Sequence, residues 1–343
     1  MSIVSQVQRL TELRSRFQTK LQAAGYEGVT SQTKYSAFAD IIDAGGGVDI
    51  DPIIARTVTS VKVPWSEIGS YTFCGCSYLV RADLPYAKRI DKYAFSACSY
   101  LVTISAPECE ELESYAVYQI QRLLQVSFPK CRRIGKYAFW CCSSINFISL
   151  PVCETIEEAA LYGYQGSNLY LPACTSLGSS AFNRSIKLQS AYLPLIPAVE
   201  SMAFEWCYAL QTFTAPKAEY IGYRAFSSCS ALSSCSLPLV SSVGSWAFYR
   251  CSNLAELSLP KCTYISASAF AGCVSLVSLY LPGSSVVSLA TTTANIFSST
   301  PIGGYSASAG VFGSVYVPES LYSAYTVSTY WSAISSRIAS YAF

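Results

Sequence analysis

Short hydrophobic segments of the form Leu-x-x-Leu-x-Leu-Pro recur along most of this chain. Clear examples are LVTISAP at Leu101–Pro107, LAELSLP at Leu254–Pro260 and LVSLYLP at Leu276–Pro282. The alternation over the last residues predicts a short, half-buried strand, and the proline ends it. The segment prolines recur every 21 or 22 residues from Pro64 to Pro282, and once more, after 36 residues, at Pro318.

A fixed period of this length predicts a solenoid, in which each coil packs only against its neighbours. A strand of about three residues cannot bury its apolar face alone, so we expect successive coils to stack with parallel strands. Each period also carries an apolar residue five positions after the proline, an Ala-Phe pair at nine and ten, and a Cys at thirteen. The pattern predicts a β-rich solenoid of about ten coils with short parallel strands on one face.

The repeat consensus, Ile-Gly-x-x-Ala-Phe-x-x-Cys-x-x-Leu-x-x-Leu-x-Leu-Pro, resembles the BspA-like class of bacterial leucine-rich repeats. The resemblance covers about Val58–Pro318. It implies a right-handed solenoid that serves adhesion and ligand binding without catalysis. Two coils depart from the consensus, with Val117 and Leu161 in place of the Phe, and Tyr164 in place of the Cys in the second. We expect these two coils to be irregular.

The N-terminal segment has a different, helical pattern. Apolar residues spaced by three or four positions predict an amphipathic helix, which Gly25 ends, and Gly45, Gly46 and Gly47 follow as a joint. Its apolar stripe consists of Ile3, Val7, Leu10, Phe17 and Leu21. The stripe could cap the first coil or form a homo-oligomer, and the glycine joint favours the second. We therefore divide the chain into an attachment module at 1–47, a solenoid at 48–282, and an irregular last repeat with a cap at 283–343.

Both ends also resemble modules of tail-associated proteins from phages and prophages of Gram-positive gut bacteria. The resemblance rests on VQRL at Val7–Leu10, YSAFADIID at Tyr35–Asp43, NIFSSTPI at Asn295–Ile302 and WSAISSRI at Trp331–Ile338. It implies a virion or tail-associated location. In the C-terminal module, apolar residues after the last strand would cover the final coil.

Composition and charge exclude several classes of protein. Hydrophobic residues make up 51% of the 343 residues and charged residues 13%, with a net charge of +2, which argues against disorder and against nucleic-acid binding. No apolar run is long enough for membrane insertion. The N-terminus lacks the pattern of a signal peptide, so we expect synthesis in the cytoplasm and a virion, tail-associated or, alternatively, cell-surface location.

The chain contains no histidine, which excludes imidazole catalysis and histidine metal ligands. Its 15 cysteines fall mainly into two columns, two and thirteen positions after the prolines. This placement predicts reduced thiols in the core, and the cysteines lack the paired spacing of a metal site. We expect no metal, no cofactor and no enzymatic activity, because the only acids on the expected outer sheet face, Asp83 and Glu256, lie many coils apart.

The outward positions of the predicted strands form an almost uncharged surface of Ser, Thr, Tyr and Asn. Tyrosine among small hydroxyl and amide side chains is typical of recognition surfaces. The candidate ligand-binding residues are Phe147, Asn168, Tyr170, Tyr192, Thr214 and Tyr280. The partner would be a protein or carbohydrate on a cell surface, although the same composition also suits a sheet that merely stacks well.

Charges alternate in sign from coil to coil just after the prolines. Lys88-Arg89 are followed by Glu110-Glu111, then by Arg132-Arg133 and Glu154. Opposite charges on adjacent strands favour the correct register, so we interpret this ladder as structural.

Taken together, the sequence predicts a non-catalytic recognition or adhesion protein. The more specific interpretation is a phage or prophage tail-associated protein that binds a receptor, or has a structural role, through the sheet face. The alternative is a cell-surface adhesin of the BspA-like class.

Overall fold

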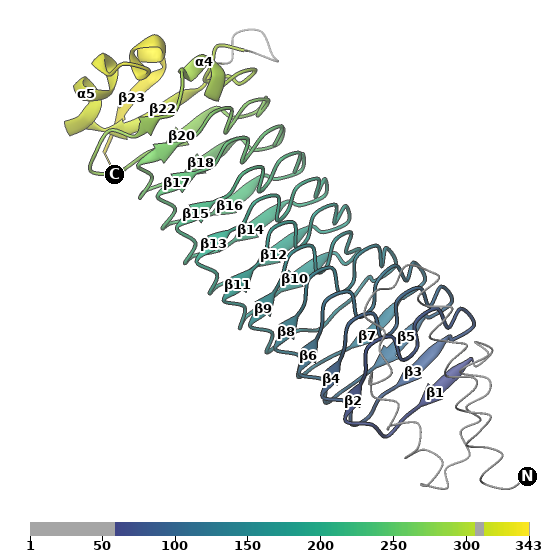
Figure 1. Cartoon of the computed structure of the whole chain (residues 1–343). Helices are drawn as coiled ribbons and strands as arrows, with labels where there is room; N and C mark the ends of the chain where they lie inside the picture. The colour runs from purple at the N-terminus through teal and green to yellow at the C-terminus, as the bar shows by residue number, and fades with distance from the viewer. Residues whose placement is uncertain (1–58, 306–311, 343) are drawn as a thin grey trace, which may run out of the picture.

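The computed structural model describes residues 59–305 and 312–342. They form an elongated, gently curved rod of about 13 parallel coils, more than the ten expected (Figure 1). The predicted attachment module at 1–47, with its stripe of Ile3, Val7, Leu10, Phe17 and Leu21, lies outside the described residues. None of the helices within the described ranges has the length and hydropathy needed to cross a membrane.

Strands of three residues run along one side of the rod, each just before a segment proline, as the repeat predicted. We call this side the long-strand face. Its pairing is parallel and in register, as in Arg81 with Thr103 and Thr103 with Gln125. The strands are β1 (Ser60–Lys62), β3 (Arg81–Asp83), β5 (Thr103–Ser105), β7 (Gln125–Ser127), β10 (Asn168–Tyr170), β12 (Ser190–Tyr192), β14 (Thr212–Thr214), β16 (Ser234–Ser236), β18 (Glu256–Ser258) and β20 (Ser278–Tyr280).

A second parallel ladder, of two-residue strands, runs along another side, which we call the short-strand face. This finding corrects the expectation of strands on one face only: a two-residue strand is too short to show an alternating pattern. Each such strand places one apolar residue inward, as Ile90 in β4 does. The strands are β2 (Glu67–Ile68), β4 (Arg89–Ile90), β6 (Glu111–Leu112), β8 (Arg133–Ile134), β9 (Thr155–Ile156), β11 (Ser176–Leu177), β13 (Ala198–Val199), β15 (Tyr220–Ile221), β17 (Ser242–Val243), β19 (Tyr264–Ile265) and β21 (Ser288–Leu289).

The third side of each coil is a series of turns around the Ala-Phe pair. In the coil after Pro85, Tyr93 and Ala97 adopt left-handed backbone conformations, with φ of 59° and 58°. Between them, the backbone N–H of Phe95 donates to the carbonyl of Ala116 in the next coil at 2.8 Å. The two left-handed residues therefore turn the backbone so that its polar groups bond to the next coil while the Phe side chain points inward.

The inward Phe side chains form a column through the core. From Phe182 to Phe297 the rings of successive coils stack, with centroids 5.3–5.8 Å apart. Val117 and Leu161 interrupt the column nearer the N-terminus, where both are buried. The coil that contains Val117 nevertheless keeps both ladders, so the expectation of irregularity there was wrong.

The ladder of the long-strand face is broken where Tyr164 replaces the Cys, as expected. Phe147 forms only an isolated bridge with Gln125, and β7 does not connect to β10. Burial raises the pKa of Tyr164, and a hydrogen bond with the Ile148 backbone partly offsets that rise. The tyrosine thus lies against the segment that remains unpaired with β10.

The short-strand face has its own break, between β11 and β13. Pro197 lies directly before β13. In the previous coil the residue at this position, Thr175, donates its backbone N–H to Glu154 at 3.0 Å. Proline has no N–H to donate, which accounts for the interruption.

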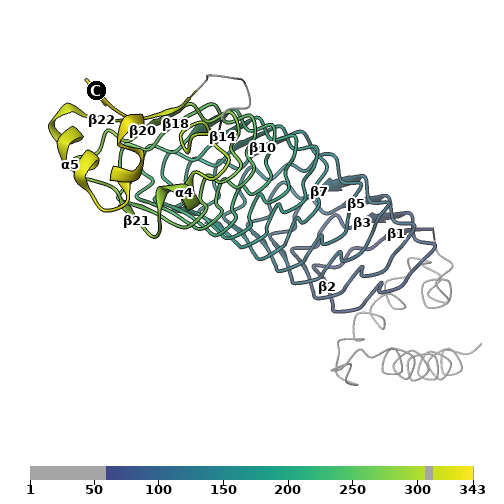
Figure 2. The same ribbon diagram turned by 90° about the horizontal axis from the view of Figure 1, so that it is seen from above.

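After the last repeat the chain forms short helices beside the final coil (Figure 2). Two aromatic side chains join them to it: the backbone N–H of Val287 donates to the Tyr325 hydroxyl at 3.0 Å, and Trp331 Nε1 donates to the Val287 carbonyl at 2.8 Å. The centroid of the Trp331 ring also lies 6.1 Å from that of Phe297, which is the last ring of the core column. The elements are α4 (Thr293–Ile296), β22 (Ser314–Pro318), η1 (Glu319–Leu321), α5 (Tyr322–Val327), η2 (Trp331–Arg337) and β23 (Ile338–Tyr341).

Candidate functional site

The cysteines are packing and hydrogen-bonding residues of the core. All 15 lie in the described part of the chain, where none is in a disulfide bond, and all except Cys141 and Cys235 are buried. In the column thirteen positions after the prolines, Sγ groups donate to a carbonyl at the Phe position of the coil before, as Cys229 does to Phe204 at 3.1 Å and Cys142 does to Val117 at 2.9 Å. A Cys of the other column, Cys131, donates to the carbonyl of Arg133, two residues ahead, at 3.3 Å. The sequence placed these residues in the core but did not reveal their role as donors.

Burial favours the protonated form of several of these thiols. It raises the pKa of Cys131 and Cys142 to about 12 and that of Cys174 to about 11. A nucleophilic cysteine needs a lowered pKa, so the chemistry of these thiols is opposite to that of a catalytic residue. Within the described part of the chain, no group of acids and cysteines is arranged to hold a metal ion.

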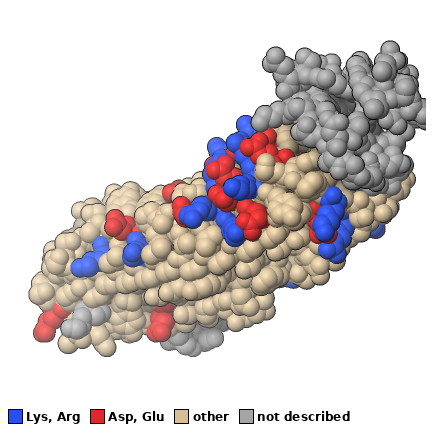
Figure 3. All heavy atoms as spheres, turned by 90° about the horizontal axis from the view of Figure 1, so that it is seen from below, with Lys and Arg blue, Asp and Glu red and all other residues tan. Residues whose placement is uncertain are grey.

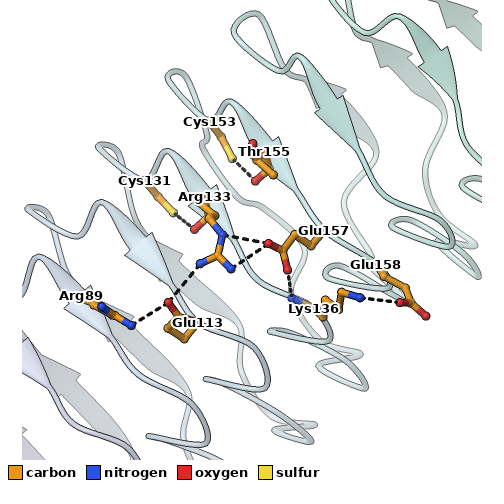
Figure 4. Close-up of polar contacts among 9 residues, drawn as sticks. All are labelled: Arg89, Glu113, Cys131, Arg133, Lys136, Cys153, Thr155, Glu157 and Glu158. Carbon is orange, nitrogen blue, oxygen red and sulfur yellow. Dashed lines mark hydrogen bonds and ion pairs between the residues drawn. The ribbon is translucent and has the colours of Figure 1, made fainter.

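The alternating charges lie on the short-strand face and pair between coils. Arg89 and Arg133 flank Glu113, at 2.9 and 3.2 Å from its Oε1, and Arg133 also reaches Glu157 at 2.8 Å (Figure 4). Register places Glu111 opposite both arginines, yet the ion pairs run to Glu113. The charges gather over the N-terminal half of the face seen in Figure 3. The acidic partners of Arg89, Arg132 and Arg133 support the structural interpretation.

The long-strand face brings together four of the six predicted binding residues. Tyr170 and Tyr192 lie directly opposite each other in β10 and β12, and their rings stack at 5.6 Å. Beside them, the Ser190 hydroxyl donates to Asn168 Oδ1 at 2.7 Å. Phe147 lies one coil earlier and is 66% exposed, and Tyr170 is 64% exposed. We call Phe147, Asn168, Tyr170 and Tyr192 the aromatic patch.

A groove of about 650 Å³ adjoins this patch. It runs along the residues that precede β10, β12 and β14, beginning at Phe147. Its polar lining is mainly amide and hydroxyl, with one cation, and comprises Asn146, Gln165, Ser167, Lys187 and Gln189. Amides offer both donors and acceptors, so the groove can hydrogen-bond a peptide backbone or sugar hydroxyls.

Of the other two predicted residues, Thr214 borders the patch directly opposite Tyr192, and Tyr280 lies away from it. Thr214 is on β14, one coil beyond Tyr192, and is half-buried. Tyr280 lies near the C-terminal end, where its ring stacks on Tyr316 at 4.8 Å and packs edge-on against Tyr341. Tyr280 is therefore part of the packing between β20, β22 and β23.

Sequence reasoning identified the patch but not the groove. The groove begins where the ladder breaks, at the segment of Phe147 that does not pair with β10. The signal was present in the sequence, as Tyr164 at a Cys position. How a larger side chain redirects the neighbouring backbone could not be inferred from the repeat.

Comparisons with known proteins agree with this architecture. The sequence profile of the BspA type leucine-rich repeat region matches residues 66–189 and 175–302, in 6 copies. A leucine-rich repeat protein from Bacteroides ovatus has a similar fold, with 20% identity over 84% of this chain and 85% of that chain and a TM-score of 0.50. A leucine-rich cell surface protein from Faecalibacterium prausnitzii is 23% identical over 66% of this chain and 73% of that chain, with a TM-score of 0.42.

Among proteins of curated function, none matches this chain. The profile alone covers more than half of the residues, and it covers the coils that carry both ladders. The chain therefore belongs to the BspA-type leucine-rich repeat family.

Proposed function

We propose that this protein is a non-catalytic binding protein that recognises a protein or carbohydrate on a cell surface through the aromatic patch and its groove. The observation that carries the proposal is the exposed Tyr170–Tyr192 stack beside the groove. A leucine-rich repeat solenoid is typically a non-enzymatic scaffold for binding, and on this scaffold function must come from a local site.

The patch has the physical properties that recognition requires. Each tyrosine presents a rigid ring that loses little conformational entropy on binding, and the stack holds both rings before a ligand arrives. Phe147 adds an apolar side chain that is exposed rather than packed. The amides and Lys187 at the edge of the patch supply directional contacts. A rigid apolar centre with a polar rim is the usual arrangement of a binding hot spot.

The finer interpretations stay predictions. A tail-associated role rests on the sequence resemblance at the two ends, and residues 1–47 lie outside the described part. A cell-surface adhesin is the alternative, and the Faecalibacterium prausnitzii protein is described as a cell surface protein. Both would use the patch in the same way, and homo-oligomer formation through the N-terminal stripe is a separate prediction, tested by comparing the full chain with residues 48–343.

The test is a double variant, Tyr170→Ala with Tyr192→Ala, compared with the unaltered protein for binding to intact bacterial and epithelial cells and to immobilised glycans. Both side chains are exposed, so the thermal unfolding midpoint should change little. Binding should fall by at least about tenfold, which corresponds to 1.4 kcal/mol.

The matched control is Tyr78→Ala with Tyr100→Ala. These tyrosines are also exposed and also stack, at 6.2 Å, but lie several coils away. The control variant should bind as the unaltered protein does. Equal binding by all three proteins, or equal loss in both variants, would exclude the patch as the site.

A further inference from the structure

A second cavity, of about 720 Å³, lies nearer the C-terminal end and shares no residue with the groove beside Phe147. It spans four successive coils at the residues that flank the buried column cysteines. These flanking pairs are Trp206 and Tyr208, Ser228 and Ser230, Arg250 and Ser252, and Gly272 and Val274. Because each Cys points inward, both of its neighbours face the cavity side.

The size of these flanking residues gives the cavity its shape. Trp206 and Tyr208 form an aromatic wall at one end, and Tyr305 lines the cavity four coils on. Between them lie the small residues Ser228, Ser230 and Ser252, together with the larger Tyr249 and Arg250. The volume lies within the range of about 300–1,000 Å³ that is usual for small-ligand sites. It therefore favours a small ligand of one or two rings, rather than a partner protein, as the occupant.

The chemistry of the lining is aromatic and hydroxylic, with one charge. Aromatic faces pack against the C–H surface of a ring while hydroxyl groups hydrogen-bond its polar substituents. The single charged lining residue is Arg250, and no acid lines the cavity. In the described part of the chain Arg250 forms no ion pair, and its guanidinium lies 5.1 Å from the centroid of the Tyr249 ring.

A glycine in the next coil leaves room for the Arg250 side chain. Gly272, in the next coil, has a φ of +77° and a bare Cα beside Arg250. A Cβ at Gly272 would lie 3.0 Å from Arg250 Cγ, so a larger residue there would press on the arginine side chain. An exposed arginine without an acidic partner, held over an aromatic ring, is suited to bind a carboxylate through two parallel hydrogen bonds.

From these features we infer that this cavity binds an acidic sugar, a pyranose ring that carries a carboxylate. The ring stacks on Trp206 or Tyr208, its hydroxyl groups bond to the serine hydroxyls, and its carboxylate pairs with Arg250. The site is independent of the aromatic patch, so either could fail without the other.

The test compares two disaccharides that differ in one group, cellobiouronic acid and cellobiose, in calorimetric or NMR titrations of the whole chain. The acidic sugar should bind at least about tenfold more tightly than the neutral one, because only its carboxylate can pair with Arg250. Arg250→Gln should remove this preference. The matched control is Arg122→Gln, since Arg122 lies over the Tyr100 ring at 4.5 Å in a distant coil. It should leave the preference unchanged.

A second variant tests the cavity itself. Ser230→Tyr should fill it and abolish binding of both sugars, and Tyr208 at the equivalent position one coil earlier indicates that the fold accepts a tyrosine there. The inference is overturned if neither sugar binds, if Arg250→Gln keeps the preference, or if a tetraglutamate peptide binds through Arg250 while the sugars do not. The last outcome would indicate an acidic peptide as the ligand.

Discussion

Arg133 Nη2 lies 2.8 Å from Glu157 Oε1, one coil further along the rod. The same guanidinium contacts Glu113 in the preceding coil, so a single side chain bridges three coils (Figure 4). Glu113 is the most buried acid of this cluster, with 12% of its side chain exposed. The contribution of Arg133 to stability should therefore exceed that of a surface ion pair, since its removal leaves a buried carboxylate with one fewer partner.

We expect Arg133→Gln to lower the free energy of unfolding by about 1–2 kcal/mol. The control is Arg132→Gln, because Arg132 pairs with Glu154 on an exposed part of the same face. Its effect should be about 0–0.5 kcal/mol. Urea unfolding of the three proteins provides the measurement, and equal effects of the two variants would contradict the structural difference between the two pairs.

The Phe column predicts a large difference between two phenylalanine substitutions. Phe226 is fully buried and stacks on Phe204 and Phe248, so Phe226→Ala should cost about 3–5 kcal/mol through the cavity that it leaves. Phe147→Ala should cost less than about 0.5 kcal/mol, because its side chain is exposed. Chemical denaturation measures both, and a large effect at Phe147 would show that this residue supports the fold.

The glycine column after the short strands packs against the backbone of the coil before. A Cβ at Gly222 would lie 2.6 Å from the backbone nitrogen of Ser201, which cannot move without disturbing its coil. We expect Gly222→Ala to destabilise the protein by about 1–3 kcal/mol. At Gly283 the nearest atom would be 3.5 Å away, so Gly283→Ala should have little effect in the same thermal unfolding experiment.

The buried thiols predict a loss of stability at alkaline pH. Because folding raises the pKa of Cys131 from 9.0 to about 12 and that of Cys174 to about 11, the unfolded chain releases these protons first. Their contribution to stability is therefore complete below about pH 9 and is lost as pH rises through the folded-state values. Guanidinium unfolding midpoints at about pH 7.5 and 10.5, at constant ionic strength, measure the loss.

Cys131→Val serves as the control for this titration. Valine fills the site with a side chain that cannot ionise, so the variant should lose less stability between the two pH values. The same loss in both proteins would mean that other groups cause it.

The sequence was sufficient to predict the structure of the average coil. It was less informative about how individual coils differ from one another. The spacing of Leu, Phe and Cys predicted the core, because each of these residues occupies one inward position, and the prolines marked where the long strands end. The alternating charges of Arg89, Glu111 and Arg133 likewise indicated which residues lie opposite one another in adjacent coils. The short strands that carry these residues had not themselves been predicted. Such periodic features depend only on nearest-neighbour stacking, which the repeat itself describes.

What the sequence left unpredicted depends on contacts between unlike coils. The groove beside Phe147 lies where the ladder of the long-strand face breaks, and Tyr280 is half-buried where Tyr316 and Tyr341 pack on it. Likewise, Glu113 rather than Glu111 pairs with the arginines, because side-chain reach decides an ion pair once register has been set.

The interruptions of the two ladders fall at different heights along the rod. The long-strand face is discontinuous at Phe147 and again between β16 and β18, while the short-strand face is discontinuous at Pro197. The interruptions of one ladder therefore never coincide with those of the other along the rod axis. At each interruption of one ladder, the other ladder keeps its hydrogen bonds between the same two coils. A force that pulls on the two ends of the rod would therefore bend it at these positions without separating the coils.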